Sequence, residues 1–453
     1  MIAAVPFIMA CNQTGQVNAT LFPASGSENV NPDTHLVLTF SETPVLGDSG
    51  MIRVCDAVTD QVVDSLDLSI PSGPTESRTY DPECDYTKVP YDYTRTVVPT
   101  NKDTRPGTPS GTAEPTPPVY QLTIIGGFTD AFHFYPVIVR DSIATIYLHN
   151  NMLEYGHTYY VTIDNGVLNL ADGSFQGVTK EDEWTFTTKS DMPELSDTLI
   201  VDATGKGDFN TVQGALDFIP DFNEQQTVIL VNPGDYEELV YTRNKWNVKI
   251  KGAGMADTKV HYANNEVFNP HPLTVKTNEW PGTFPSRRAA FMLDNCKDIV
   301  IEDMTIATDL KGQAEGLLIN GERIALYRVH IIGSGDALQA NGTIYMESCE
   351  LDGGGDTILG RGSLFAYKSN FRNGGGPFSW VRNTAGNHGN VFVECTFSTE
   401  DGKQADYGRT KSNHGSAYPD AEFVLIDCKV KNIIPEGWSS IGAKTAKMYE
   451  YNT

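Results

Sequence analysis

Two aspartates in glycine-rich segments carry the clearest chemical signal in this sequence. Asp336 lies in the segment Gly-Ser-Gly-Asp-Ala-Leu, and Asp356 lies in Gly-Gly-Gly-Asp-Thr-Ile, 20 residues further on. Two neighbouring carboxylates repel each other, so one pKa rises, while a nearby cation keeps the other group charged. This separation yields one acid and one nucleophile or base. Aspartates beside glycines also cap turns, so the spacing alone leaves a structural role open.

The chain around these aspartates has a repeat of about the same length. Short apolar segments recur with shortest steps of 19–20 residues, centred near Ile250, Ile301, Leu326, Tyr345, Phe365, Phe392 and Leu425. Recurring strands at this spacing, with Gly/Asn turns and no helices between them, predict a right-handed parallel β-helix over residues 197–453. Each coil of such a fold buries its apolar side chains only by stacking on its neighbours.

The repeat predicts how the two aspartates are placed. Adjacent strands lie ~4.8 Å apart, so equivalent positions one coil apart put Asp336 and Asp356 side by side. Gln313 lies 23 residues before Asp336 and could occupy the preceding coil. Residues 208–220 carry Phe209, Val212, Leu216 and Ile219 at helical spacing before a proline, which predicts a helix that caps the open end of the stack.

The N-terminal half has a different sequence pattern. Residues 19–190 contain short segments in which apolar and polar residues alternate. This pattern predicts short β-strands that form a β-sandwich. A long insertion at about 71–118 is rich in Pro, Thr, Tyr and Asp. The stretch Asn-Pro-Asp-Thr-His-Leu-Val-Leu-Thr-Phe-Ser that begins at Asn31 resembles a bacterial Ig-like domain, a resemblance that implies no catalysis. The predicted fold class is therefore all-β, an Ig-like sandwich followed by a β-helix.

Length, charge and the N-terminus narrow the class of protein further. The 453 residues suit two or three domains, and the net charge of −25 makes a nucleic-acid partner unsuitable, because phosphate binding needs a basic face. Residues 1–18 begin with an apolar stretch that ends at Ala10, directly before Cys11. This segment resembles a bacterial lipoprotein signal, so we expect export, to the medium, the periplasm or the cell surface, with Cys11 lipidated and anchored in an outer membrane.

Further motifs from residue 199 onward resemble the pectin methylesterases, or pectinesterases, a family of carbohydrate esterases. They occur in family order and are Val201-Asp-Ala-Thr-Gly-Lys-Gly-Asp-Phe, Gly234-Asp-Tyr-Glu-Glu, Gln313-Ala-Glu-Gly-Leu, Gly335-Asp-Ala-Leu, Asp356-Thr-Ile-Leu-Gly, Tyr407-Gly-Arg and Pro435-Glu-Gly-Trp. The resemblance spans about 199–453. It implies hydrolysis of the methyl esters of galacturonate units in pectin, with release of methanol and with neither a metal nor an organic cofactor.

The resemblance also implies a role for each matching residue. Asp356 is expected to be the nucleophile, and Asp336 the general acid that later acts as base. Arg409 is expected to orient Asp356, and Gln313 to donate a hydrogen bond to the oxyanion. Gly335 is a departure, because the family usually has glutamine there.

Four residues are expected to bind the substrate. Trp438 matches an aromatic residue of the family's cleft region, and Trp380 could line a sugar cleft. Lys411 stands where the family usually has tryptophan and adds a cation. Arg361 could hold a substrate carboxylate.

Two other functions remain open at this point. Paired carboxylates also serve glycoside cleavage, so a β-helical pectin glycosidase or lyase is the first alternative. The second is a non-catalytic pectin-binding surface protein, which the departures at Gly335 and Lys411 keep open. The sequence does not indicate an oligomeric state.

Overall fold

The computed structural model describes residues 17–75, 120–128, 132–269, 287–411, 418–438 and 441–453. Within these ranges the chain is almost entirely β, with one short helix, which confirms the all-β fold. Cys11 and most of the predicted insertion at 71–118 lie outside the described residues.

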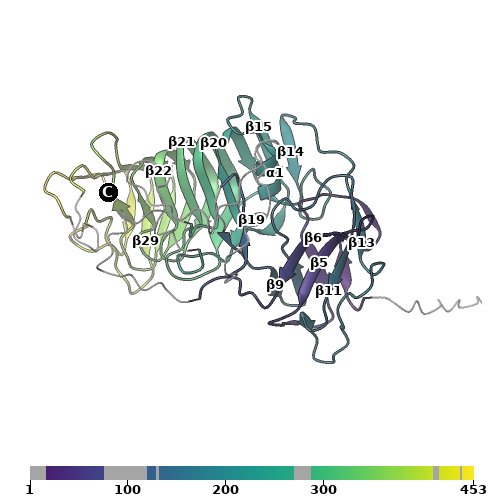
Figure 1. The fold of residues 1–453 in the computed structure, drawn as a ribbon. Coiled ribbons are helices and arrows are strands. Elements are labelled where there is room, and N and C mark those ends of the chain that lie inside the picture. The colour runs from purple at the N-terminus through teal and green to yellow at the C-terminus, as the bar shows by residue number, and fades with distance from the viewer. Residues whose placement is uncertain (1–16, 76–119, 129–131, 270–286, 412–417, 439–440) are drawn as a thin grey trace, which may run out of the picture.

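The N-terminal region consists mainly of two sheets that share one cluster of buried apolar residues (Figure 1). One sheet has the order β1 (Thr20–Phe22), β3 (Leu36–Thr39), β10 (Ile143–Ile146), β9 (Val137–Arg140). The other has the order β2 (Ser27–Val30), β13 (Thr185–Thr188), β11 (Thr158–Ile163), β5 (Met51–Asp56), β6 (Val62–Asp67). Two small pairs are β4 (Val45–Leu46) with β12 (Leu168–Asn169), and β7 (Leu122–Thr123) with β8 (Phe132–His133). The Ig-like character of this region stays a prediction.

The rest of the chain is a stack of parallel coils with three faces (Figure 1). Three long strands bend around the stack and contribute to more than one face: β20 (Phe291–Thr308), β21 (Leu317–Ile332) and β22 (Leu338–Glu347). The first face adds β14 (Thr198–Val201), β15 (Thr227–Val231), β18 (Trp246–Lys251), β25 (Ser363–Tyr367), β28 (Asn390–Val393), β30 (Glu422–Ile426) and β32 (Lys447–Tyr451). The second adds β16 (Gly234–Glu237), β19 (Thr258–Tyr262), β23 (Glu350–Gly353), β26 (Asn370–Asn373), β29 (Thr396–Thr399) and β31 (Lys429–Lys431). The third adds β17 (Val240–Arg243), β24 (Ile358–Gly360) and β27 (Ser379–Val381).

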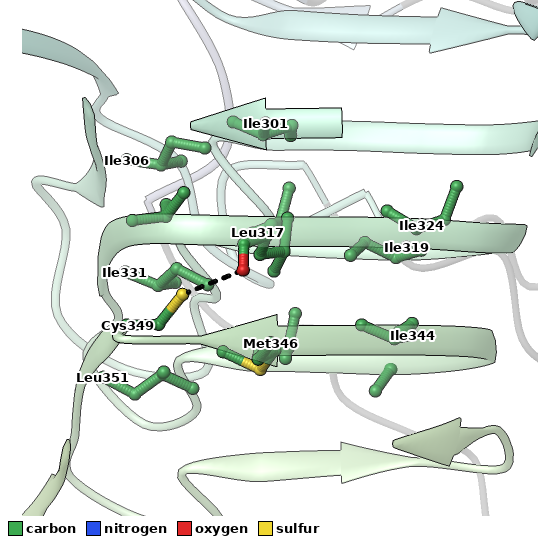
Figure 2. Packing of buried hydrophobic residues seen from close by; sticks show 14 of the residues in the cluster. Ile301, Ile306, Leu317, Ile319, Ile324, Ile331, Ile344, Met346, Cys349 and Leu351 are labelled. Carbon is green, nitrogen blue, oxygen red and sulfur yellow. Dashed lines mark hydrogen bonds between the residues drawn. The ribbon is translucent and has the colours of Figure 1, made fainter. Parts of the chain in front are cut away.

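Aliphatic side chains from successive coils fill the inside of the stack. Ile301, Leu326 and Met346 are paired neighbours on three successive coils, and all three are fully buried. Figure 2 shows such side chains pointing into the interior, where the Cys349 thiol donates to the Leu326 carbonyl at 3.4 Å. Each fully buried aliphatic side chain contributes about 1.5–3 kcal/mol. This continuous core fixes the register of the coils and hence of the residues on their edges.

The predicted helix is present in a shorter form, α1 (Val212–Phe218). Thr211 caps it by accepting a hydrogen bond from the Gly214 amide, which satisfies one of the free N–H groups of the first turn. The helix ends at Ile219, whose extended backbone suits a residue before proline. Its buried Leu216 joins the core of the first coils.

Apolar contacts join the N-terminal region to the first coils of the stack. Ile125, Phe128 and Phe132 pack in one buried cluster with Tyr241 and Tyr262. These contacts involve β17 and β19, at the start of the β-helix.

Candidate active site

Three carboxylates occupy equivalent positions on three successive coils, at the start of the third face. Leu317 pairs with Leu338, and Leu338 pairs with Ile358. Glu315, Asp336 and Asp356 each lie two residues before one of these paired positions. We call these three residues the acid ladder. The two aspartates therefore stand one coil apart, as their spacing predicts, and Glu315 adds a third acid in the same row.

Asp356 receives a bidentate ion pair from Arg409. The Nε of Arg409 donates to Oδ1 at 2.9 Å, and Nη2 donates to Oδ2 at 2.6 Å. Asp356 is only 8% exposed, so this geometry fixes the plane of its carboxylate and balances its charge. Arg409 is positioned by a parallel bridge to Trp380 in β27.

Asp336 has a more crowded electrostatic environment. Nη2 of Arg288 donates to its Oδ2 at 2.9 Å, but the same guanidinium also makes three bonds of 2.7–2.9 Å to the fully buried carboxylate of Glu315. Burial raises the pKa of Asp336 to about 7. Arg288 and Arg382 oppose this rise, whereas the charges of Glu315 and Asp356 add to it. Asp336 can therefore carry a proton near neutral pH.

Gln313 lies next to this arginine. Its Oε1 accepts a hydrogen bond from Nη1 of Arg288 at 3.1 Å. An amide group whose oxygen is held in this way must present its Nε2 hydrogens elsewhere. Arg288 therefore fixes Gln313 as a hydrogen-bond donor.

Gly335 is required by a close approach between two loops. A Cβ at this position would lie 2.6 Å from the carbonyl oxygen of Gly312, closer than real Cβ contacts. A glutamine at residue 335 would therefore need the loop that carries Gly312 to move. The close approach therefore favours glycine at residue 335 in this chain.

The four predicted substrate-binding residues lie in different surroundings. The ring of Trp380 lies 4.2 Å from the guanidinium of Arg409, so it is beside the acid ladder. Arg361 follows β24 directly and is half-buried, and Lys411 is exposed, with its carbonyl accepting a bond from Arg409 at 3.2 Å. Trp438 instead packs its ring against Tyr407 and Phe423, with centroids 5.0 Å apart in both pairs. Its contact with sugar stays a prediction.

Sequence reasoning missed two residues of this cluster, Arg288 and Glu315. Glu315 precedes Asp336 by 21 residues, so the repeat contained the signal. Arg288 had no such signal, because no motif or spacing connects it with the aspartates.

Elsewhere in the described part of the chain, one group has the composition of a metal site. Glu237, His261 and Asp309 bring ligand-type atoms within 4.8 Å of one another. Arg140 forms ion pairs with Glu237 and, at 3.4 Å, with Asp309, so a cation already balances these acids. The described residues include no helix with the length and apolarity needed to cross a membrane.

The fold and the site define a parallel β-helix with a row of carboxylates held by two arginines. A family model described as Pectinesterase matches residues 198–448, more than half of the chain, so the chain belongs to the pectinesterase family. The match leaves the N-terminal region outside it.

Several known proteins are similar to this chain. The chain is 28% identical over 258 residues to pectinesterase QRT1 of Arabidopsis thaliana, covering 53% of this chain and 64% of the relative. It is 25% identical over 264 residues to pectinesterase 31 of the same plant, covering 55% and 80%. The solved structure of a pectin methylesterase from carrot aligns with a TM-score of 0.44 at 18% identity, covering 58% of this chain and 90% of that one.

Proposed function

We propose that this protein hydrolyses the methyl esters of galacturonate units in pectin and releases methanol. The observation that carries the proposal is the placement of two aspartates one coil apart with different partners, Arg409 on Asp356 and the shared Arg288 on Asp336. Membership of the pectinesterase family supports the same reaction class.

In the first half of the reaction, Asp356 acts as the nucleophile. One of its carboxylate oxygens attacks the ester carbonyl carbon, and Asp336 gives its proton to the departing methoxy oxygen, so that methanol leaves. The pKa of Asp336 near 7 supports this role, because a protonated carboxyl group is needed at that moment. The product of this step is an acyl-enzyme on Asp356.

In the second half, Asp336 acts as the base. It takes a proton from water while the water oxygen attacks the acyl-enzyme, and the galacturonate carboxyl group is released. Asp356 regains its carboxylate and Asp336 its proton. One water is consumed and one methanol is formed for each ester.

Gln313 is proposed to stabilise the oxyanion in both halves. Its Nε2 is the group left to donate once Arg288 binds Oε1. One such donor typically contributes about 3 kcal/mol to the transition state. Arg288 therefore positions two groups of the reaction, Gln313 and Asp336.

The remaining residues are proposed to hold the polymer. Trp380, beside Arg409, offers an aromatic ring to a sugar, and Trp438 is proposed to do so near Tyr407. Arg361 and Lys411 supply positive charge to an acidic polysaccharide.

Methanol release measured together with chain length tests this function. Methyl-esterified pectin incubated with the protein should yield methanol without shortening, and added chelator should leave the rate unchanged. Shortening without methanol would instead indicate the glycosidase or lyase alternative, and binding without either product would indicate a non-catalytic pectin-binding protein.

We also propose export with a lipid on Cys11, which lies outside the described residues. Fatty-acid labelling of the protein should be lost in Cys11→Ser. Equal labelling of both proteins would contradict the lipid attachment.

A further inference from the structure

Two buried cysteines stand opposite each other on adjacent coils, at the corner between the first and second faces. Thr396 pairs with Lys429 in the parallel strands β29 and β31, and the strands that lead to this corner, β28 and β30, are paired as well. Cys395 and Cys428 directly precede the paired residues, so they occupy equivalent positions. The Lys429 amide donates to the Cys395 carbonyl at 2.8 Å, which continues the register across the corner.

The two cysteines also share their backbone conformation and their burial. Each follows a residue in the left-handed region, Glu394 or Asp427, and both of these residues have a φ of 53°. Cys395 is 1% exposed and Cys428 is 5% exposed. Each thiol donates to the carbonyl oxygen two residues earlier at 3.4 Å. The two side chains therefore leave equivalent corners in the same way.

The spacing of these two residues suits a disulfide. Adjacent strands lie ~4.8 Å apart, and disulfides join Cα atoms that are roughly 4.4–6.8 Å apart. The two side chains are already in contact, because the thiol of Cys395 donates a hydrogen bond to the sulfur of Cys428. This hydrogen bond lowers the pKa of Cys428 to about 7, although burial opposes the change. Cys428 is therefore the thiol that more readily forms the reactive thiolate.

Cys349 lies in the same column but is too far away to join this pair. The pairing of β23 with β26, and of β26 with β29, places Ser369 between Cys349 and Cys395. Two strand spacings amount to ~9.6 Å, which exceeds the span of a disulfide. The Cys349 amide donates to Oγ of Ser369 at 3.1 Å. Cys349 is therefore a control within the same column.

We propose that Cys395 and Cys428 form a disulfide that cross-links two adjacent coils of the β-helix and stabilises them. The bond closes a loop that contains Arg409, the residue that holds the carboxylate of Asp356. A closed loop has fewer unfolded conformations, so the cross-link favours the folded coil that supplies Arg409. The proposal needs neither esterase activity nor export.

An external disulfide, such as oxidised glutathione, is the oxidant. The Cys428 thiolate attacks one of its sulfurs and releases one glutathione thiolate. The Cys395 thiolate then attacks the sulfur of Cys428, so that the protein disulfide forms and the second glutathione thiolate leaves. The two protons of the cysteine thiols pass to the two glutathiones, which are reduced as the cysteines are oxidised. Both thiols are buried in the folded protein, so the exchange takes place while the chain folds.

Cell-free synthesis of the full chain tests the proposal, because the oxidant then has access to the folding chain. One synthesis contains a mixture of oxidised and reduced glutathione, and the other contains an excess of reductant. The soluble protein is unfolded, its free thiols are alkylated, and its peptides are analysed by mass spectrometry. The oxidising synthesis should give a peptide pair joined through Cys395 and Cys428 that is absent from the reducing one. Complete alkylation of both residues, or equal amounts of links to Cys349, would overturn the proposal.

Thermal unfolding followed by circular dichroism measures the consequence of the bond. The wild type from the oxidising synthesis should unfold about 5–15 °C above the wild type from the reducing one. Cys349→Ser should retain this difference and the joined peptides, whereas Cys428→Ser should lose both. An equal difference in Cys428→Ser would contradict the stabilising role of the bond. The peptide result for the wild type decides the pairing even where a buried serine lowers the yield of a folded variant.

Discussion

The third face of the β-helix has two edges of opposite charge. At its start, Glu315, Asp336 and Asp356 form the acid ladder, and each acid is ion-paired with an arginine. At its end, Arg361 and Arg382 follow the paired residues Gly360 and Val381, and the Nε of the buried Arg382 lacks a hydrogen-bond partner in the described part of the chain. One repeat thus builds both rows, because every strand brings a residue to each edge.

The difference between the two edges separates chemistry from binding. Charges in the acid ladder are balanced within the protein, so they are fixed before substrate arrives, as a reacting group requires. At the other edge, the Nε of the buried Arg382 has no hydrogen-bond partner among the described residues, so its charge is less well balanced within the protein. Substitutions at the first edge should therefore change kcat, and those at the second should change the affinity for acidic chains.

The largest effect expected beyond the nucleophile itself belongs to Asp336→Asn. Asparagine cannot transfer a proton, so kcat for methanol release should fall by about 10²–10⁴, the range typical of general acid–base catalysis. Asp352→Asn is a matched control, because Asp352 lies on the second face in an ion pair with Arg372. A similar loss in both variants, or none in Asp336→Asn, would contradict the assignment.

A smaller effect is expected for Gln313→Ala. Removal of one oxyanion donor should lower kcat by about 10²–10³ and leave binding of an unesterified galacturonate hexamer unchanged. Weaker hexamer binding at an unchanged kcat would place Gln313 with the binding residues instead. Steady-state kinetics and calorimetry separate these outcomes.

The smallest effect is a shift in the pH profile of Glu315→Gln. Asp336 must be protonated to act as an acid, so the wild-type rate should fall as the pH rises through about 7. Removing the Glu315 charge ends its repulsion and frees Arg288 for Asp336, and both changes lower the pKa of Asp336. The alkaline loss of activity should therefore begin at lower pH in Glu315→Gln than in the wild type.

Glu302→Gln serves as the control for this profile, because Glu302 pairs with Lys249 and Lys251 away from the site. The alkaline part of the pH–rate profile of Glu302→Gln should coincide with that of the wild type. If the alkaline loss of activity in Glu315→Gln begins at the same pH as in the wild type, or at higher pH, Glu315 does not govern the charge of Asp336.

How much the sequence could predict depended on the regularity of the repeat. The 20-residue step between Asp336 and Asp356 matches one coil, so their adjacency followed from the period. Trp380 and Arg409 are 29 residues apart, and an irregular coil of that length hides their pairing. Arg288 reaches the acids through the length of its side chain, which no spacing rule describes.

Trp438 was predicted from a motif, yet its ring packs on Tyr407 and Phe423, because an aromatic side chain at the end of the stack also covers the core.

Methanol release by the wild type and by Asp356→Asn tests the central claim most directly. The amide cannot attack the ester carbonyl, so the account predicts release at the background rate by Asp356→Asn, with an unfolding temperature close to that of the wild type and pectin still bound. Release by Asp356→Asn at the wild-type rate would show that Asp356 is not the nucleophile, and the mechanism proposed for the acid ladder would be wrong.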